Sequence, residues 1–167
     1  MKKRAEGGDA EAINFLGCAY YNGQYGFRRN YNKANKLWLQ AGERGCASAY
    51  YNIGNFYING EGVERDEKKA RYYFELAAMR GDAKARHNLG SIECGAGNTN
   101  RAVKHFAISA GAGDDDSFAG IKNYFLVGHA TKCDFETALR AHKEAADEMK
   151  SAQREAAASF LASRRGV

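Results

Sequence analysis

The chain has 167 residues, of which 44% are hydrophobic and 27% charged, an ordinary balance for a globular protein. No apolar run approaches the roughly 20 residues that a membrane-spanning helix needs, and no apolar segment of an export signal follows the basic N-terminus. The net charge of +5 comes from the two ends, because residues 5–163 carry 20 basic and 20 acidic side chains. We therefore expect an intracellular, cytoplasmic protein with no membrane and no nucleic-acid partner, since phosphate binding needs clustered basic residues.

A nine-residue spacing that starts at a glycine recurs four times. The four pairs are Gly8 and Gly17, Gly45 and Gly54, Gly81 and Gly90, and Gly113 and Lys122. We call the second member of each pair the anchor, and an aliphatic residue precedes it every time. One register in four places predicts four repeats, over residues 9–45, 46–81, 82–113 and 114–150.

Each repeat has the apolar pattern of two helices. In the first half, apolar residues lie five and one before the anchor and two or three after it, as at Ala49, Ile53 and Phe56. In the second half, an alanine is followed by an aromatic residue or histidine and then by a small residue. These triplets are Ala34-Trp38-Ala41, Ala70-Phe74-Ala77, Ala102-Phe106-Ser109 and Ala138-His142-Ala145. Both spacings lie on one helical face, so each repeat is predicted to be a helix pair.

Capping residues mark the ends of the predicted second helices. A preferred N-cap residue precedes each leading alanine by four positions: Asn30, Asp66, Asn98 and Asp134. Gly45, Gly81 and Gly113 end the first three repeats, as expected at a left-handed C-terminal position. A further helix is expected at about residues 151–163, where its alanines with Phe160 and Leu161 would cap the last repeat. Because residue 8 starts a repeat almost at once, scarcely any N-terminal cap is expected.

The second repeat resembles the Sel-one-like repeat, a relative of the tetratricopeptide repeat. The matching residues are Ala49, Ile53-Gly54, Tyr57, Gly60, Gly62-Val63, Asp66, Lys69-Ala70, Tyr73-Phe74, Ala77-Ala78 and Gly81. The resemblance extends from residue 8 to about 150 and departs from the family at Lys122. It implies one all-α domain over residues 1–167, a right-handed α/α superhelical solenoid of four helix pairs plus the C-terminal capping helix. It also implies an adaptor or scaffold role, including in ubiquitin-ligase assemblies.

Three segments also resemble an algal-type subgroup of this family, some of whose members carry an upstream RING-type zinc finger. The segments are residues 47–55, 128–132 and 150–154. No C-x2-C pair is present, because Cys18, Cys46, Cys94 and Cys133 lie far apart, so the resemblance does not carry ligase activity to this chain.

The reactive side chains form no recognisable catalytic or metal motif. The four cysteines occupy unrelated repeat positions, so we expect reduced thiols packed as small hydrophobic groups. His87, His105, His129 and His142 make no short metal-binding motif. The run Asp114–Asp116 lies at a predicted helix start, where carboxylates favour the helix dipole. We therefore expect a non-enzymatic protein with no catalytic residue, metal or cofactor.

In helix-pair solenoids, the first helices line the concave side, and their outward positions form the candidate binding face. The positions three before and one after the anchor supply the candidate residues Asn14, Tyr51, Asn55, His87, Ser91 and Asn123. Asparagine and tyrosine suit hydrogen bonding to an extended peptide.

The sequence thus predicts a monomeric adaptor that holds a peptide segment or a partner domain on its concave face. The alternatives are an ordinary solvent-exposed face, a hydrolase of the kind claimed for cysteine-rich bacterial relatives, and the substrate-recognition part of a ubiquitin-ligase assembly.

Overall fold

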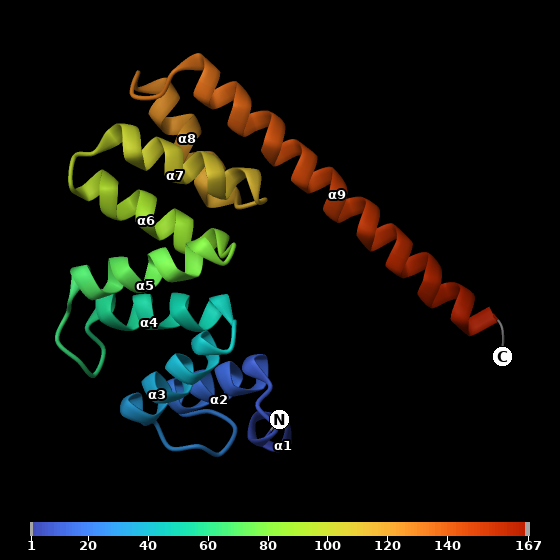
Figure 1. Cartoon of the computed structure of the whole chain (residues 1–167). Coiled ribbons are helices and arrows are strands. Elements are labelled where there is room, and N and C mark those ends of the chain that lie inside the picture. Colours follow the sequence, from blue (N-terminus) through green and yellow to red (C-terminus); the bar gives the residue numbers. More distant parts are fainter. Residues whose placement is uncertain (1, 166–167) are drawn as a thin grey trace. The chain divides into compact units, whose positions relative to one another are not determined.

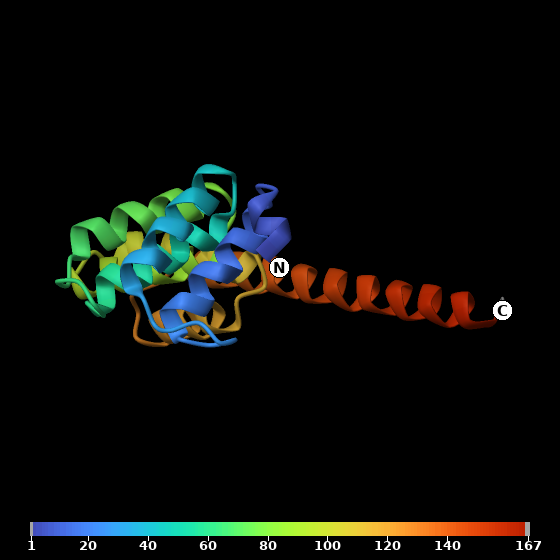
Figure 2. The same cartoon turned by 90° about the horizontal axis from the view of Figure 1, so that it is seen from below.

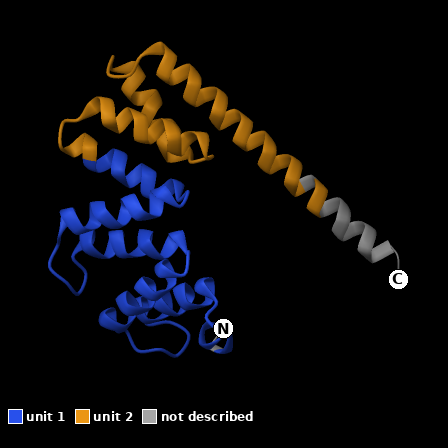
Figure 3. Ribbon diagram, viewed as in Figure 1, with its two compact units in different colours: residues 1–92 blue, residues 93–167 orange. Residues whose placement is uncertain are grey.

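The computed structural model describes residues 2–165, without the side chains of residues 2, 154 and 157–165. This part of the chain forms nine α-helices and no strand. It divides into two compact units, residues 1–92 and 93–167, which are described separately (Figure 3). The side chains of Phe160 and Leu161, predicted to cap the last repeat, lie outside the described residues.

Unit 1 contains the first two helix pairs and most of the first helix of the third. Its helices are α1 (Lys2–Glu6), α2 (Ala10–Asn22), α3 (Tyr31–Glu43), α4 (Ala47–Asn59), α5 (Glu67–Met79) and α6 (Ala83–Gly95), of which residues 83–92 belong to this unit. Helices α2 and α3, and then α4 and α5, pack as successive pairs (Figure 1). The boundaries follow the predicted periodicity, but α1 was not predicted.

Two anchor glycines of unit 1, Gly17 and Gly54, lie directly beneath the aromatic residue of the second helix. A Cβ atom on Gly17 would lie 2.5 Å from Cδ1 of Trp38, and one on Gly54 would lie 2.5 Å from Cδ1 of Phe74. Real Cβ atoms do not approach other atoms so closely, so glycine is required for the two helices to close on the ring. The close contact between ring and backbone explains why glycine recurs at the anchor position.

Aromatic rings also join the first repeat to the second. The Phe56 ring of the second repeat lies 6.2 Å from the Trp38 ring and 6.4 Å from the Tyr21 ring of the first. Farther along α3, a Cβ on Gly42 would lie 2.6 Å from Cε1 of Tyr50. A small residue on α3 therefore lets α4 approach, and the buried rings hold the two repeats together.

Most of the predicted helix ends in unit 1 are confirmed. The side chain of Asn30 accepts a hydrogen bond from the Lys33 backbone N–H at 2.9 Å, and Asp66 accepts the equivalent bond from Lys69 at 2.9 Å. Gly45 and Gly81 have φ angles of +97° and +87°. These are left-handed conformations that glycine adopts without strain.

Unit 2 contains the end of α6 and the helices α7 (Thr99–Gly111), α8 (Asp115–Leu126) and α9 (Lys132–Arg165). Phe106 and Ile121 lie in its core. The separate capping helix expected near residue 151 is wrong, because α9 continues through that point and extends past α7 and α8 (Figures 1 and 2). Residues 147–156 contain no glycine or proline and several strong helix formers, so nothing stops the helix there.

Of the two predicted N-caps in unit 2, Asp134 is wrong, whereas Asn98 is the N-cap residue of α7 as expected but forms no side-chain capping bond. Thr131 directly precedes helix α9. Its Oγ1 accepts a hydrogen bond from the Asp134 N–H at 3.2 Å, and the Asp134 carboxylate accepts one from the Thr131 N–H at 3.0 Å. This reciprocal pair is a capping box, in which Asp134 takes the third helical position. Asn98 precedes α7 but makes no side-chain capping bond, because its amide donates to Glu93 instead.

Candidate binding surfaces

The candidate face in unit 1 consists of two pairs of asparagine amides that link successive first helices. Nδ2 of Asn52 on α4 donates to Oδ1 of Asn14 on α2 at 3.0 Å and also lies 3.4 Å from the Cys18 sulfur. Nδ2 of Asn88 on α6 donates to Oδ1 of Asn55 on α4 at 3.1 Å. The face therefore has the same amide contact at both of its helix junctions.

The donors of both pairs, Asn52 and Asn88, are not among the predicted residues. They lie two residues before their anchors, whereas the predicted residues lie three before and one after. Asn52 contacts Asn14 and Cys18, which lie three before and one after the anchor of the first repeat. Asn88 contacts Asn55, which lies one after the anchor of the second repeat. The recurrence of asparagine at one repeat position in the second and third repeats was the available signal.

The predicted residues differ in how much of them a ligand can reach. Asn14, Tyr51, Asn55 and His87 are half-buried, and Ser91 is exposed. The Tyr51 ring packs 6.1 Å from Phe74, so this side chain is also part of the core. The remaining predicted residue, Asn123, is exposed on α8 of unit 2. Unit 1 thus holds Asn14 on α2, and Tyr51 and Asn55 on α4, two of the three first helices that form the amide pairs.

A hollow of about 330 Å³ lies beside Asn14. Its lining residues are Arg4, Glu11, Ala12, Asn14, Phe15 and Cys18. The Arg4 guanidinium pairs with Asp9 at 2.5 Å, and burial raises the pKa of the Cys18 thiol above its usual range. The hollow therefore offers an apolar wall, an amide and side chains of both charges, and its thiol stays protonated at neutral pH.

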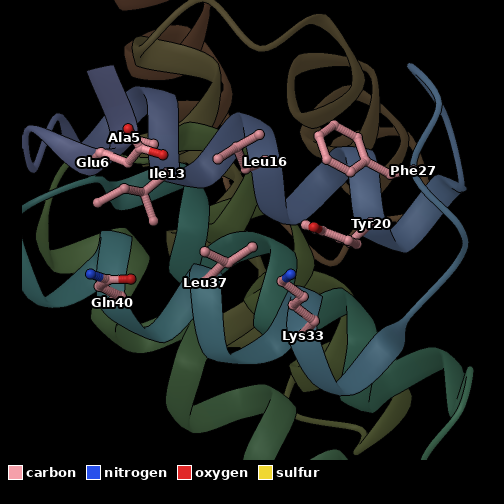
Figure 4. Close-up of a pocket in the computed structure, with 9 residues that line it drawn as sticks. All are labelled: Ala5, Glu6, Ile13, Leu16, Tyr20, Phe27, Lys33, Leu37 and Gln40. Atoms are coloured by element: carbon pink, nitrogen blue, oxygen red, sulfur yellow. The ribbon is translucent and has the colours of Figure 1, made fainter. Parts of the chain in front are cut away.

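A second hollow, of about 260 Å³, lies at the other side of α2 (Figure 4). Residues from α1, α2 and α3 and the loop between α2 and α3 surround it: Ala5, Glu6, Ile13, Leu16, Tyr20, Phe27, Lys33, Leu37 and Gln40. Apolar side chains of α2 and α3 form its walls, and the Lys33 ammonium lies 4.3 Å from the Tyr20 ring centroid. We call this hollow the end groove.

The cysteines are free thiols in two different environments. Cys46 is buried, which raises its pKa to about 11, and Cys18 is half-buried. Cys94 and Cys133 are exposed, so the expectation that all four pack as hydrophobic groups is wrong for these two. Both follow a charged residue near a helix end, Glu93 and Lys132. Within the described residues, no three His, Cys, Asp or Glu side chains are grouped closely enough to hold a metal ion.

Unit 2 contains a buried carboxylate, Glu93, that is not among the predicted site residues. Glu93 is 1% exposed, accepts a hydrogen bond from Asn98 Nδ2 at 2.8 Å and lies 3.6 Å from the Arg101 guanidinium. It takes the position three after the anchor, where the first two repeats have Tyr20 and Tyr57. The bonds connect α6 to the start of α7 across a shortened turn, so we assign Glu93 a structural role. In the sequence, an acidic residue at a repeat position that is otherwise tyrosine, next to a shortened turn, could have indicated this buried carboxylate.

Helix pairs in one register, joined by anchor glycines and capped at left-handed glycines, define an α/α repeat solenoid. The Sel1 repeat family matches three consecutive segments, residues 10–46, 47–82 and 83–114. The chain belongs to this family. The fourth predicted repeat lies outside the match, although α8 and the first half of α9 pack as its helix pair.

Two solved structures support the fold class. A Sel1 repeat protein from Oxalobacter formigenes is similar with a TM-score of 0.75 and 28% identity, over 88% of this chain and 62% of that one. A protective antigen of uropathogenic Escherichia coli that displays an SLR fold is similar with a TM-score of 0.72 and 29% identity, over 88% of this chain and 32% of that one. The chain therefore spans less than two thirds of either relative, and the predicted all-α solenoid of helix pairs is confirmed.

Solenoids of Sel1 repeats typically serve as non-catalytic scaffolds for protein–protein interaction. No helix within residues 2–165 is both long enough and apolar enough to cross a membrane.

Proposed function

We propose that the chain is a non-enzymatic interaction module that binds an extended peptide segment of a partner protein on the face formed by α2, α4 and α6. The observation that carries this proposal is the pair of amide contacts, Asn14 with Asn52 and Asn55 with Asn88. They place four half-buried amides along three successive helices of unit 1.

Each amide pair leaves most of its hydrogen-bonding capacity unused, because an amide oxygen can accept two bonds and an amide nitrogen can donate two. The bonds within the pairs employ the nitrogens of Asn52 and Asn88 and the oxygens of Asn14 and Asn55. Among the described residues, the Asn14 nitrogen and the Asn52 oxygen have no further partner, so each pair offers one donor and one acceptor. A peptide backbone offers the same two groups, and an extended segment leaves them unpaired.

The amide contacts also prepare the face for binding. A hydrogen-bonded amide has already lost part of its side-chain freedom, which lowers the entropy lost when a ligand binds. The hollow beside Asn14 lies next to the first pair and could receive one ligand side chain against Phe15. A partner would thus be recognised by its backbone along the amides and by one side chain at the hollow.

Selection from a phage-displayed random-peptide library tests this proposal. We expect selected peptides to lose at least tenfold in affinity to the double variant Asn52→Ala with Asn88→Ala, because about 1.4 kcal/mol corresponds to one or two hydrogen bonds. The matched control is Asn22→Ala with Asn59→Ala, which changes the exposed last residues of α2 and α4. Equal losses in both double variants, or no selected peptide, would contradict the proposal.

We also propose that the module acts as a cytoplasmic monomer on proteins rather than on nucleic acids. The equal numbers of basic and acidic side chains in residues 5–163 support a protein partner. We expect analytical ultracentrifugation to give the mass of one chain at both low and high salt concentration.

A further inference from the structure

The face of unit 1 that carries the amide pairs, which we call the amide face, differs in charge between its two ends. It is formed by α2, α4 and α6 (Figure 1). Helix α2 contains one charged residue, Glu11, and α4 contains none. The part of α6 that belongs to this unit contains Lys84 and Arg86. The three helices are therefore acidic, uncharged and basic in chain order.

The charges at the two ends take the same repeat position. Glu11 and Lys84 lie six before their anchors, where the second repeat has Ser48. On an α-helix this position lies on the same side as the positions three before, two before and one after the anchor, which hold the amides. Arg86 lies two residues after Lys84 and so on the opposite side of α6. The amide face thus has one carboxylate at α2 and one ammonium group at α6.

A ligand can reach both charged side chains. Glu11, Ser48 and Lys84 are all exposed. Ser48 stays exposed although amide bonds join its helix to α2 on one side and to α6 on the other. A further helix packed beside α2 or α6 would leave this repeat position just as accessible. The access to Glu11 and Lys84 is therefore independent of what precedes or follows unit 1 in the chain.

At the acidic end, no neighbouring cation cancels the charge of Glu11. Arg4 lines the same hollow as Glu11, but its guanidinium is paired with the carboxylate of Asp9. Glu11 also lies beside the Cys46 thiol and contributes, after burial, to the raised pKa of that thiol. A protonated thiol is neutral, so it leaves the negative charge of Glu11 available to a cation of the ligand.

At the basic end, the charge of Lys84 is also available. The nearest acidic residue along the chain, Asp82, caps α6, because its carboxylate accepts a hydrogen bond from the Ala85 N–H at 2.8 Å. Its charge therefore faces the positive end of the α6 dipole. Within the described part of the chain, Lys84 forms no ion pair. An anionic group of the ligand would be attracted to it.

We propose that the peptide bound on the amide face carries a basic residue that pairs with Glu11 and an acidic residue that pairs with Lys84. The axes of packed helices lie about 8–10 Å apart, so the two steps from α2 to α6 cover roughly 16–20 Å. An extended chain covers about 3.3 Å per residue, which separates the two charges of the peptide by about five or six residues. This inference rests on the proposed peptide-binding function and adds the charges that fix the register of the peptide.

The peptides selected from the phage-displayed library test the inference. We expect opposite charges five or six positions apart to be enriched at least threefold over the unselected library, and charges of equal sign at this spacing not to be enriched. For one selected peptide, Glu11→Gln and Lys84→Gln should each weaken binding about threefold in fluorescence anisotropy, as for an exposed ion pair. Each loss should disappear when the partner charge in the peptide is replaced by alanine.

Glu43→Gln and Lys36→Gln are the matched controls, because both residues are exposed on α3 and lie outside the amide face. They change the net charge equally and should leave the affinity unchanged. Selected peptides that depend on Asn52 and Asn88 but lack the charge pair, or that lose equally in the control variants, would overturn this inference alone. Selected peptides that bind normally to Asn52→Ala with Asn88→Ala, or the absence of any selected peptide, would overturn the proposed function as well.

Discussion

The two units solve the same packing problem in different ways. In unit 1, Gly17 and Gly54 let the Trp38 and Phe74 rings lie against the backbone of the partner helix. In unit 2, the anchor of the fourth repeat is Lys122, which is exposed. A side chain at the anchor leaves no place for a ring, so the fourth repeat needs another contact between its two helices.

That contact is made by His142, which takes the position of Trp38 and Phe74 in the sequence register. Its ring stacks on Phe118 at a centroid distance of 4.6 Å and an interplanar angle of 2°. Nδ1 donates to the Ala110 carbonyl oxygen at 3.0 Å, and Nε2 lies 3.2 Å from the Asp115 carboxylate. Ring stacking and polar contacts of His142 thus replace the packing of an aromatic ring against an anchor glycine. The repeat spacing is therefore kept in the fourth repeat although a different contact holds its helices together.

The largest expected effect comes from filling the anchor position in unit 1. Gly54→Leu would force the Phe74 ring out of its place, because even a Cβ atom would lie too close. We expect a loss of about 3 kcal/mol in the free energy of unfolding, measured by urea denaturation. Lys122→Leu in unit 2 is the matched change and should alter stability by less than about 0.5 kcal/mol. Similar losses in both variants would show that the two anchors are equivalent after all.

Much of the fold could be predicted because the repeat register reflects local constraints. A ring over a glycine, an Asn or Asp at a helix start and a left-handed glycine at a helix end each require particular residue types. The break expected near residue 151 rested on the repeat length alone. The sequence around it contains no glycine or proline that would end a helix, and this was the available signal for the continuous α9. Helix α1 was missed because five residues give too little periodicity, although Gly8 shares the register of Gly45 and Gly81.

A reciprocal exchange tests whether the ring positions of the two units are interchangeable. Phe74→His would bury an imidazole in an apolar site where Phe74 is 1% exposed, at an expected cost of about 2 kcal/mol. His142→Phe would remove one of the hydrogen bonds that the Ala110 carbonyl accepts, since the Gly113 N–H also donates to it at 2.9 Å, at an expected cost of about 1 kcal/mol. Thermal or urea unfolding of both variants measures the exchange. An unchanged His142→Phe variant would mean that the polar contacts of His142 contribute little.

The contacts of the candidate face were predicted less completely than the fold, for a physical reason. Helical periodicity gives the side of a helix on which a residue lies, and it assigned Asn14 and Asn55 to the outward side of the first helices, where the structure shows them bonded to Asn52 and Asn88. It does not give the contacts between repeats, so the donors Asn52 and Asn88 were missed. The burial of Glu93 depends on a shortened turn and on Asn98 and Arg101, which no periodic pattern contains.

The smallest expected effect concerns a position where the repeats should be interchangeable, the N-cap of the second helix. The Lys69 backbone N–H, and then its side chain, hold the pKa of Asp66 below its usual range. Because the folded pKa is lowered, the stabilisation is present above the pKa of the unfolded chain and is lost as the pH falls through the folded value. Asn30 makes the same capping bond without a charge. We therefore expect Asp66→Asn to keep its melting temperature near pH 7 and to flatten its decline between about pH 5 and about pH 2. Asn30→Asp should steepen that decline, and parallel curves for wild type and both variants would show that the charge at this cap contributes nothing.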